Sequence, residues 1–184
     1  MIIYSLLSKG TVSEVYMAES ILNNKRILAV DDEPDILETL QEHLEDYDGL
    51  ILDKAMDYDT GYHLLRTRKY DLVILDIMGV RGFDLLNEAA SSGFPAVMLT
   101  AQAFSREALK EAIETGAWAY LPKEKISEIV PFLEDVLTLG CQSSWRLLFE
   151  RLGGFFNSSF GPDWQKDEKE FWQEAASGSI NRNR

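Results

Sequence analysis

Five polar side chains follow short apolar runs in this sequence and could act together: Asp31, Asp32, Asp76, Thr100 and Lys123. Carboxylates held close together repel, since a pair about 4 Å apart costs roughly 4 kcal/mol at an effective dielectric of about 20. A raised pKa on one acid or a bound divalent cation offsets this cost, and hard oxygen ligands favour Mg²⁺. With a hydroxyl and an amine nearby, such a cluster suits phosphoryl transfer, in which the protein positions the phosphoryl group and neutralises its charge.

The apolar runs are expected to be parallel β-strands, which would place these side chains at one edge of a sheet. From Lys25 onward they alternate with amphipathic stretches, a pattern typical of strands joined by helices. Functional groups of an open parallel sheet gather at the carboxyl ends of its strands. The strands are predicted at residues 26–30, 50–55, 72–75, 96–99 and 118–121.

Five helices are expected to alternate with these strands. The first begins near Pro34, which suits a first helical turn, and the fourth lies between a Ser105 cap and Gly116. Pro131 lies within the stretch predicted as the fifth helix and indicates either a late helix start or a kink. The remaining helices are predicted at residues 58–68, 82–90 and 126–139. The fold class is therefore α/β, a doubly wound five-stranded parallel sheet with an appended C-terminal helical tail.

The formal net charge of −13 over 184 residues is concentrated in the middle of the chain. Residues 1–24 carry −1, residues 25–139 carry −12 (11 Lys and Arg against 23 Asp and Glu), and residues 140–184 carry zero. An acidic central block repels phosphate backbones, so no direct binding of nucleic acid is expected. No stretch approaches about 18 consecutive apolar residues, so no membrane association is expected. Cys141 is the only cysteine, which fits a reducing compartment and predicts a cytoplasmic location.

Two segments flank the central unit of residues 25–139. Residues 1–24 fit a short helix, a disordered leader, or an upstream extension of a chain whose natural start is Met17. Residues 140–184 predict a helical, aromatic tail that is too short for a typical independent output domain. Its aromatic side chains are expected to pack on the central unit, with docking of a partner as the alternative.

Four motifs within residues 25–139 carry a family resemblance: ILAVDDEPDI, DLVILDIM, VMLTA and GAWAYLPK. Together, and in this order, they resemble the CheY-like receiver domain of response regulators in two-component signalling. The resemblance implies the strand order 2-1-3-4-5 and a signalling switch rather than an enzyme. It also implies a phosphoryl donor, either a sensor histidine kinase or a phosphotransfer protein, and a downstream protein target that the sequence does not identify.

The resemblance assigns the acidic residues to phosphoryl transfer and metal binding. Asp76 would be the phosphoacceptor, which forms an acyl phosphate. Asp31 and Asp32 would hold Mg²⁺ together with Asp76, and the backbone carbonyl of Met78 would be a further ligand. Mg²⁺ is therefore the cofactor that the resemblance implies.

The remaining roles concern contact with the phosphoryl group and the switch. Thr100 would hydrogen-bond a phosphoryl oxygen, and Lys123 would pair with the phosphoryl group. As Thr100 moves towards the phosphate, Tyr120 would turn inward and change the face formed by the fourth helix, fifth strand and fifth helix. A homodimer could form through the same face.

The sequence departs from the family pattern at two places. After the phosphoacceptor, the family has a Pro and then a Gly about eight residues on, whereas this chain has no Pro and places Gly82 six residues after Asp76. Gly79 is expected to supply the unusual backbone angles of this compressed loop. The family also has a Pro after its Lys, with a cis peptide, whereas here Pro122 precedes Lys123.

Two other functions fit parts of the pattern. A degenerate receiver would act as an interaction module without phosphorylation, although the complete acidic set argues against it. A Mg²⁺-dependent phosphohydrolase of the haloacid-dehalogenase type would need two acids two residues apart after the first strand, with the first as nucleophile, and that pattern is absent.

Overall fold

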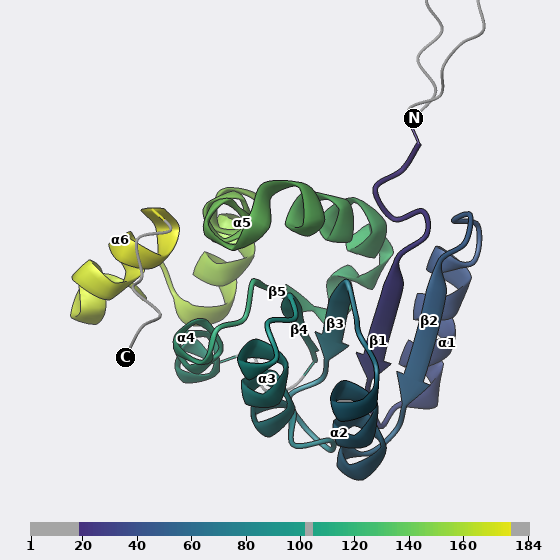
Figure 1. The fold of residues 1–184 in the computed structure, drawn as a ribbon. Coiled ribbons are helices and arrows are strands. Elements are labelled where there is room, and N and C mark those ends of the chain that lie inside the picture. The colour runs from purple at the N-terminus through teal and green to yellow at the C-terminus, as the bar shows by residue number, and fades with distance from the viewer. Residues whose placement is uncertain (1–18, 102–104, 178–184) are drawn as a thin grey trace, which may run out of the picture.

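The computed structural model describes residues 19–101 and 105–177 of the chain. Five parallel strands form one sheet in the order β2-β1-β3-β4-β5, as predicted (Figure 1). The strands are β1 (Arg26–Val30), β2 (Ile51–Ala55), β3 (Leu72–Leu75), β4 (Ala96–Thr100) and β5 (Ala119–Pro122). Every residue of β3, β4 and β5 is buried, because helices cover both faces of the sheet. Residues 1–18, most of the predicted N-terminal extension, lie outside the described residues.

The helices cover the sheet in two layers. Helices α1 (Pro34–Leu44) and α5 (Ile129–Phe160) lie on one face, and α2 (Tyr58–Thr67), α3 (Gly82–Ser91) and α4 (Arg106–Thr115) lie on the other (Figure 1). Local chemistry sets several helix ends. Asp57 caps α2 by accepting a hydrogen bond from the amide of Thr60, and Ser105 caps α4 by accepting one from Ala108, as predicted for Ser105.

The end of the central unit differs from the prediction. A short 3-10 helix, η1 (Lys123–Glu128), follows β5, so α5 begins at Ile129 rather than near residue 126. Pro131 therefore lies in the first turn of α5, where its missing amide hydrogen breaks no helical bond. The late start, one of the two interpretations left open, is the one observed.

Helix α5 does not stop near residue 139 but continues to Phe160 across a break at Gly140, where φ is 68° and ψ is 178°. The chain turns there, and the second stretch of α5 folds back along β5 towards α4 (Figure 1). A short helix, η2 (Lys166–Glu168), and then α6 (Lys169–Ser177) follow. None of the helices in the described parts of the chain is both long enough and apolar enough to cross a bilayer.

Aromatic side chains along the tail pack together in a group that we call the aromatic cluster: Trp145, Phe149, Phe156, Trp164 and Trp172. Four of these five side chains are buried, and Phe149 is partly buried against them. The ring centroids of Trp164 and Trp172 lie 4.7 Å apart in an edge-on arrangement. The aromatic side chains of the tail thus form one hydrophobic core with the central unit.

Candidate functional site

The sheet brings the predicted site residues to one edge. Asp31 follows β1, Asp76 follows β3, Thr100 ends β4, and Lys123 follows β5. These four strands are neighbours in the sheet, so their carboxyl ends lie side by side. A cavity of about 300 Å³ opens there, lined by Asp32, Glu33, Asp76, Met78, Thr100, Ala101 and Lys123.

Three carboxylates form the acidic part of the site. One oxygen from each of Asp31, Asp32 and Asp76 lies within 4.8 Å of the others. Asp31 and Asp76 are buried, whereas Asp32 is exposed and can keep water on a shared ion. This donor set fits Mg²⁺, which accepts carboxylate oxygens and retains several waters.

Lys123 reaches the acidic cluster although Pro122 precedes it and no cis peptide occurs among the described residues. Its Nζ lies 2.7 Å from Oδ2 of Asp31 and 3.4 Å from Oδ1 of Asp76. The side chain is only 6% exposed, so these ion pairs are little screened by water. The departure from the family pattern at this position therefore leaves the lysine in place.

Glu33 is a member of the site that the sequence reasoning missed. Its Oε1 lies 2.8 Å from Nζ of Lys123, and its backbone amide donates to Oδ1 of Asp31 at 3.0 Å. The available signal was its position two residues after Asp31, where the chain turns from β1 into α1. Glu33 gives Lys123 a third anionic partner, after Asp31 and Asp76, at the mouth of the cavity.

The electrostatics of the site favour an added positive charge. Burial, together with the nearby charge of Asp31, raises the pKa of Asp76 to about 6, although the charge of Lys123 opposes the shift. Burial also raises the pKa of Asp31 despite its hydrogen bond from Lys123. Burial lowers the pKa of Lys123, but its hydrogen bonds to Asp31 and Glu33 outweigh that effect, so this pKa is raised. The single positive charge of Lys123 therefore does not offset the cost of burying the carboxylates of Asp31 and Asp76.

The loop between β3 and α3 is tightly wound, as its shortness predicted. Gly79 has a φ of 70°, which confirms its expected role, and Arg81 has a φ of 55°. A Cβ on Gly82 would lie 1.9 Å from the carbonyl oxygen of Asp76, so only glycine fits there. The carbonyl of Met78, the predicted metal ligand, faces the amide of Val80 at 2.6 Å and keeps a second lone pair.

Thr100 has a buried hydroxyl that lines the same cavity, and its Oγ1 has no hydrogen-bond partner among the described residues. A buried polar group without a partner costs free energy, so the Oγ1 of Thr100 would gain stability from a hydrogen bond to a ligand in this cavity. A phosphoryl oxygen on Asp76 would be such a ligand.

Replacing Thr100 with valine is expected to leave the unmodified protein as stable as the wild type, or to stabilise it by up to about 1 kcal/mol, because an unsatisfied hydroxyl is removed. Chemical denaturation measures this difference. Thr60→Val is the control: its hydroxyl donates to Asp57 at 3.0 Å, so its loss should destabilise. A loss of more than about 1 kcal/mol in Thr100→Val would show that the hydroxyl already has a partner.

Tyr120 is fully buried in this structure. Burial raises the pKa of its hydroxyl, and the charge of Asp76 raises it further, so the ring lies within electrostatic reach of the site. The expected turn of Tyr120 from outside to inside would start from a ring that is already inside. The role of this residue in a switch stays a prediction.

Comparisons with known proteins agree with this geometry. The family model of the response regulator receiver domain matches residues 27–133. The chain is 40% identical over 102 residues to the probable transcriptional regulatory protein SilR of Salmonella typhimurium, an alignment that covers 53% of this chain and 44% of that protein. It is 33% identical over 156 residues to the transcriptional regulatory protein PdtaR of Mycobacterium tuberculosis, with 74% of this chain and 75% of that protein covered.

A solved structure gives the same result. The crystal structure of a CheY-like receiver domain protein from Methanospirillum hungatei JF-1 aligns with a TM-score of 0.55 and 26% identity, over 62% of this chain and 94% of that one. The chain spans only 44% of the length of SilR, so the similarity to that relative is confined to part of it. With the family model matching more than half of its residues, the chain belongs to the response regulator receiver domain family.

Proposed function

We propose that the chain is a phosphorylation-dependent switch that accepts a phosphoryl group on Asp76 from a sensor histidine kinase or a phosphotransfer protein. The observation that carries this proposal is the position of Asp76. Its carboxylate is buried at the end of β3, grouped with two other carboxylates and 3.4 Å from the lysine amine. A hydroxyl without a described partner faces the same cavity.

The proposed transfer forms one bond and breaks one. An oxygen of the Asp76 carboxylate attacks the donor phosphorus, the bond from phosphorus to the donor atom breaks, and the leaving nitrogen of a phosphohistidine takes a proton from water. Asp31, Asp32 and the carbonyl of Met78 would hold Mg²⁺, which supplies positive charge against the phosphoryl oxygens. Lys123 would pair with the phosphoryl group and Thr100 would donate to one of its oxygens.

Labelling by a small phosphodonor tests the proposal. The wild-type chain with Mg²⁺ and acetyl phosphate should gain one phosphoryl group, seen by intact-mass spectrometry, and Asp76→Asn should gain none. Asp59→Asn is the control, since this exposed acid lies in the first turn of α2, outside the cavity-lining set. Labelling that persists in Asp76→Asn, or an unlabelled wild type, would overturn the assignment.

An interaction module that works without phosphorylation is the second candidate. The buried position of Tyr120 favours it, because this ring does not need a phosphoryl group to enter the core. The same labelling experiment separates the two candidates, since the module predicts no phosphoryl gain in the wild type.

The net charge of −12 on residues 25–139 supports an output through protein contacts rather than direct contact of this unit with nucleic acid. The names of SilR and PdtaR describe transcriptional regulators, and that function is theirs.

A further inference from the structure

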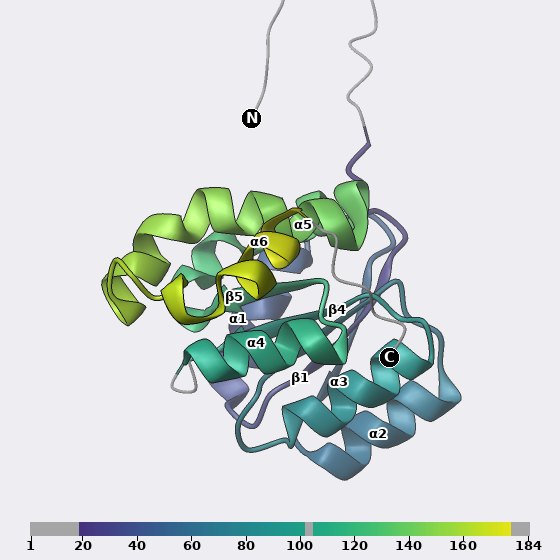
Figure 2. The same ribbon diagram turned by 90° about the vertical axis from the view of Figure 1, so that its left-hand side faces the viewer.

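A further cavity, which we call the basic pocket, lies at the edge of the sheet opposite Asp76. Helices α2 and α3 lie side by side, and the chain runs from the end of α2 into β3 and from the end of α3 into β4 (Figure 2). A cavity of about 250 Å³ opens where these two connections run, at the amino ends of the strands. It is lined by Leu65, Arg66, Thr67, Arg68, Lys69, Ser92 and Phe94.

The two arginines of the basic pocket are only partly neutralised. A guanidinium nitrogen of Arg66 lies 3.1 Å from a carboxylate oxygen of Glu88, and one of Arg68 lies 2.6 Å from a carboxylate oxygen of Asp53. Arg26 also pairs with Asp53, at 2.8 Å, so two guanidinium groups share this carboxylate. A guanidinium carries five N–H donors in a planar fork, so these contacts leave donors of both pocket arginines available for a ligand.

Lys69 adds a positive charge that no carboxylate balances. Its Nζ lies 5.4 Å from the ring centroid of Phe94, a cation–π contact with a side chain that lines the pocket. Among the residues that the structure describes, no acid lies within ion-pair distance of this amine. Counting Arg26, the network holds four cations against the carboxylates of Asp53 and Glu88, which leaves two positive charges in excess. The central unit as a whole carries −12, so the sign of the charge is reversed locally.

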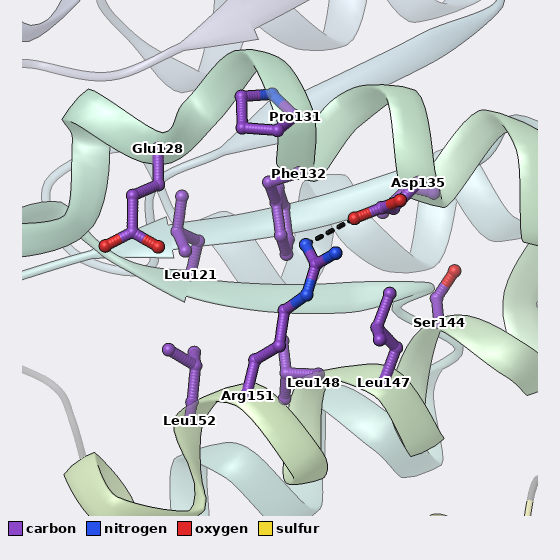
Figure 3. Close-up of a pocket in the computed structure, with 11 residues that line it drawn as sticks. Leu121, Glu128, Pro131, Phe132, Asp135, Ser144, Leu147, Leu148, Arg151 and Leu152 are labelled. Carbon is purple, nitrogen blue, oxygen red and sulfur yellow. Dashed lines mark hydrogen bonds and ion pairs between the residues drawn. The ribbon is translucent and has the colours of Figure 1, made fainter. Parts of the chain in front are cut away.

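Arg151, which lines a different pocket, shows the opposite arrangement. Figure 3 shows its guanidinium group paired with Asp135 in a pocket whose other lining side chains are mostly apolar. One carboxylate meets one guanidinium there, so no excess positive charge remains to attract an anion. The basic pocket differs because its cations outnumber their acidic partners.

The chemistry of the basic pocket indicates the class of ligand that it would take. Planar guanidinium groups match the oxygens of phosphate, and two excess charges match a phosphomonoester, which carries about −1.5 to −2 at pH 7. Leu65 and the ring of Phe94, which is 7% exposed, give the wall an apolar part that suits a short organic group. The volume lies below the roughly 300–1,000 Å³ of pockets for drug-sized ligands, so the ligand must be small.

We propose that the basic pocket binds the phosphate group of a small phosphomonoester. Arg66, Arg68 and Lys69 would contact the phosphate oxygens from the connection that follows α2, and Ser92 from the connection that follows α3. The ligand would neutralise the excess charge and join the two connections. The proposal does not depend on phosphoryl transfer to Asp76, because that residue lies at the other edge of the sheet and lines a separate cavity.

Titration of the full chain, followed by proton–nitrogen correlation NMR without Mg²⁺ and at constant ionic strength, tests the proposal. Glycerol 3-phosphate should shift the amide signals of residues 65–69 and 92–94 in a saturable way, and chloride should not. The dissociation constant should rise about tenfold in Lys69→Gln, as expected for the loss of one charge-assisted contact, and stay close to the wild-type value in Lys69→Arg. Lys54→Gln is the matched control, because it removes an exposed lysine of β2 that does not line the pocket.

The outcomes either support the site or overturn it. Equal shifts with chloride and glycerol 3-phosphate, or the same loss of affinity in Lys69→Gln and Lys54→Gln, would mean that the chain responds only to general charge. Inorganic phosphate is the second probe, and binding of it as tight as that of glycerol 3-phosphate would overturn the ester and assign the pocket to free phosphate. Labelling of Asp76 is measured separately, so the failure of this inference leaves the proposed function standing.

Discussion

Replacing Gly82 with alanine is expected to destabilise the protein by about 3 kcal/mol and to abolish labelling of Asp76. The added Cβ would lie 1.9 Å from the carbonyl oxygen of Asp76 and 2.8 Å from Cα of Ile77. Both atoms belong to the backbone, so neither can rotate away as a flexible side chain would. Either the end of β3 or the start of α3 must move, and the first of these shifts carries the nucleophile with it.

Chemical denaturation and intact-mass labelling measure the two effects of Gly82→Ala. Gly153→Ala is the matched control, because Gly153 lies within α5 and a Cβ there meets no atom within 4 Å. It should keep full labelling and gain up to about 1 kcal/mol, since alanine favours helix more than glycine does. A Gly82→Ala protein with wild-type stability would mean that the loop after Asp76 adapts more freely than its close approach to the strand indicates.

Asp76→Asn is expected to stabilise the protein in the absence of Mg²⁺ by about 2–3 kcal/mol at about pH 7.5. Burial and then the charge of Asp31 raise the pKa of Asp76 from 3.8 to about 6. A carboxyl with a raised pKa in the folded state destabilises that state wherever it is ionised, and protonation removes the penalty. This contribution to stability therefore improves as pH falls from about 7 towards about 4, below which the unfolded chain binds the same proton.

The measurement compares the free energy of unfolding of both proteins in chelator at about pH 7.5 and about pH 5. The difference between wild type and Asp76→Asn should shrink at the lower pH, and taking the difference cancels the effects of titrating groups that do not interact with Asp76. Mg²⁺ at millimolar concentration should stabilise the wild type more at the higher pH, because protons compete for the same carboxylates. A variant no more stable than the wild type at about pH 7.5 would contradict the buried, unbalanced charge inferred for this site.

Most of the central unit could be predicted because its signals are local. An apolar run such as Leu72–Leu75 is buried on both faces of the sheet, and the Ser105 cap marks the start of α4 through one hydrogen bond. The carboxyl ends of parallel strands all lie at the same edge of the sheet. The acids and Lys123, which follow these strand ends, are therefore brought together.

The features that could not be predicted depend on contacts between distant segments. The pairing of Glu33 with Lys123 joins residues ninety positions apart, and the position of Glu33 two residues after Asp31 does not by itself indicate that pairing. The tail docks on α4 because the chain turns at Gly140. The residues on both sides of Gly140 have helical periodicity, so the sequence does not reveal this turn. The sequence predicts an aromatic tail that packs, but not the surface that receives it.

The backbone conformation at Gly140 determines whether α5 extends away from the sheet or folds back onto it. With φ of 68° and ψ of 178°, it occupies a region that is essentially confined to glycine. Without that bend, the 32 residues of α5 would form a rod about 48 Å long that carries Trp145 and the phenylalanines of its second stretch away from the sheet into water. Such an exposed apolar stripe would favour association with a neighbouring chain, so the backbone conformation of one glycine keeps these side chains inside the fold.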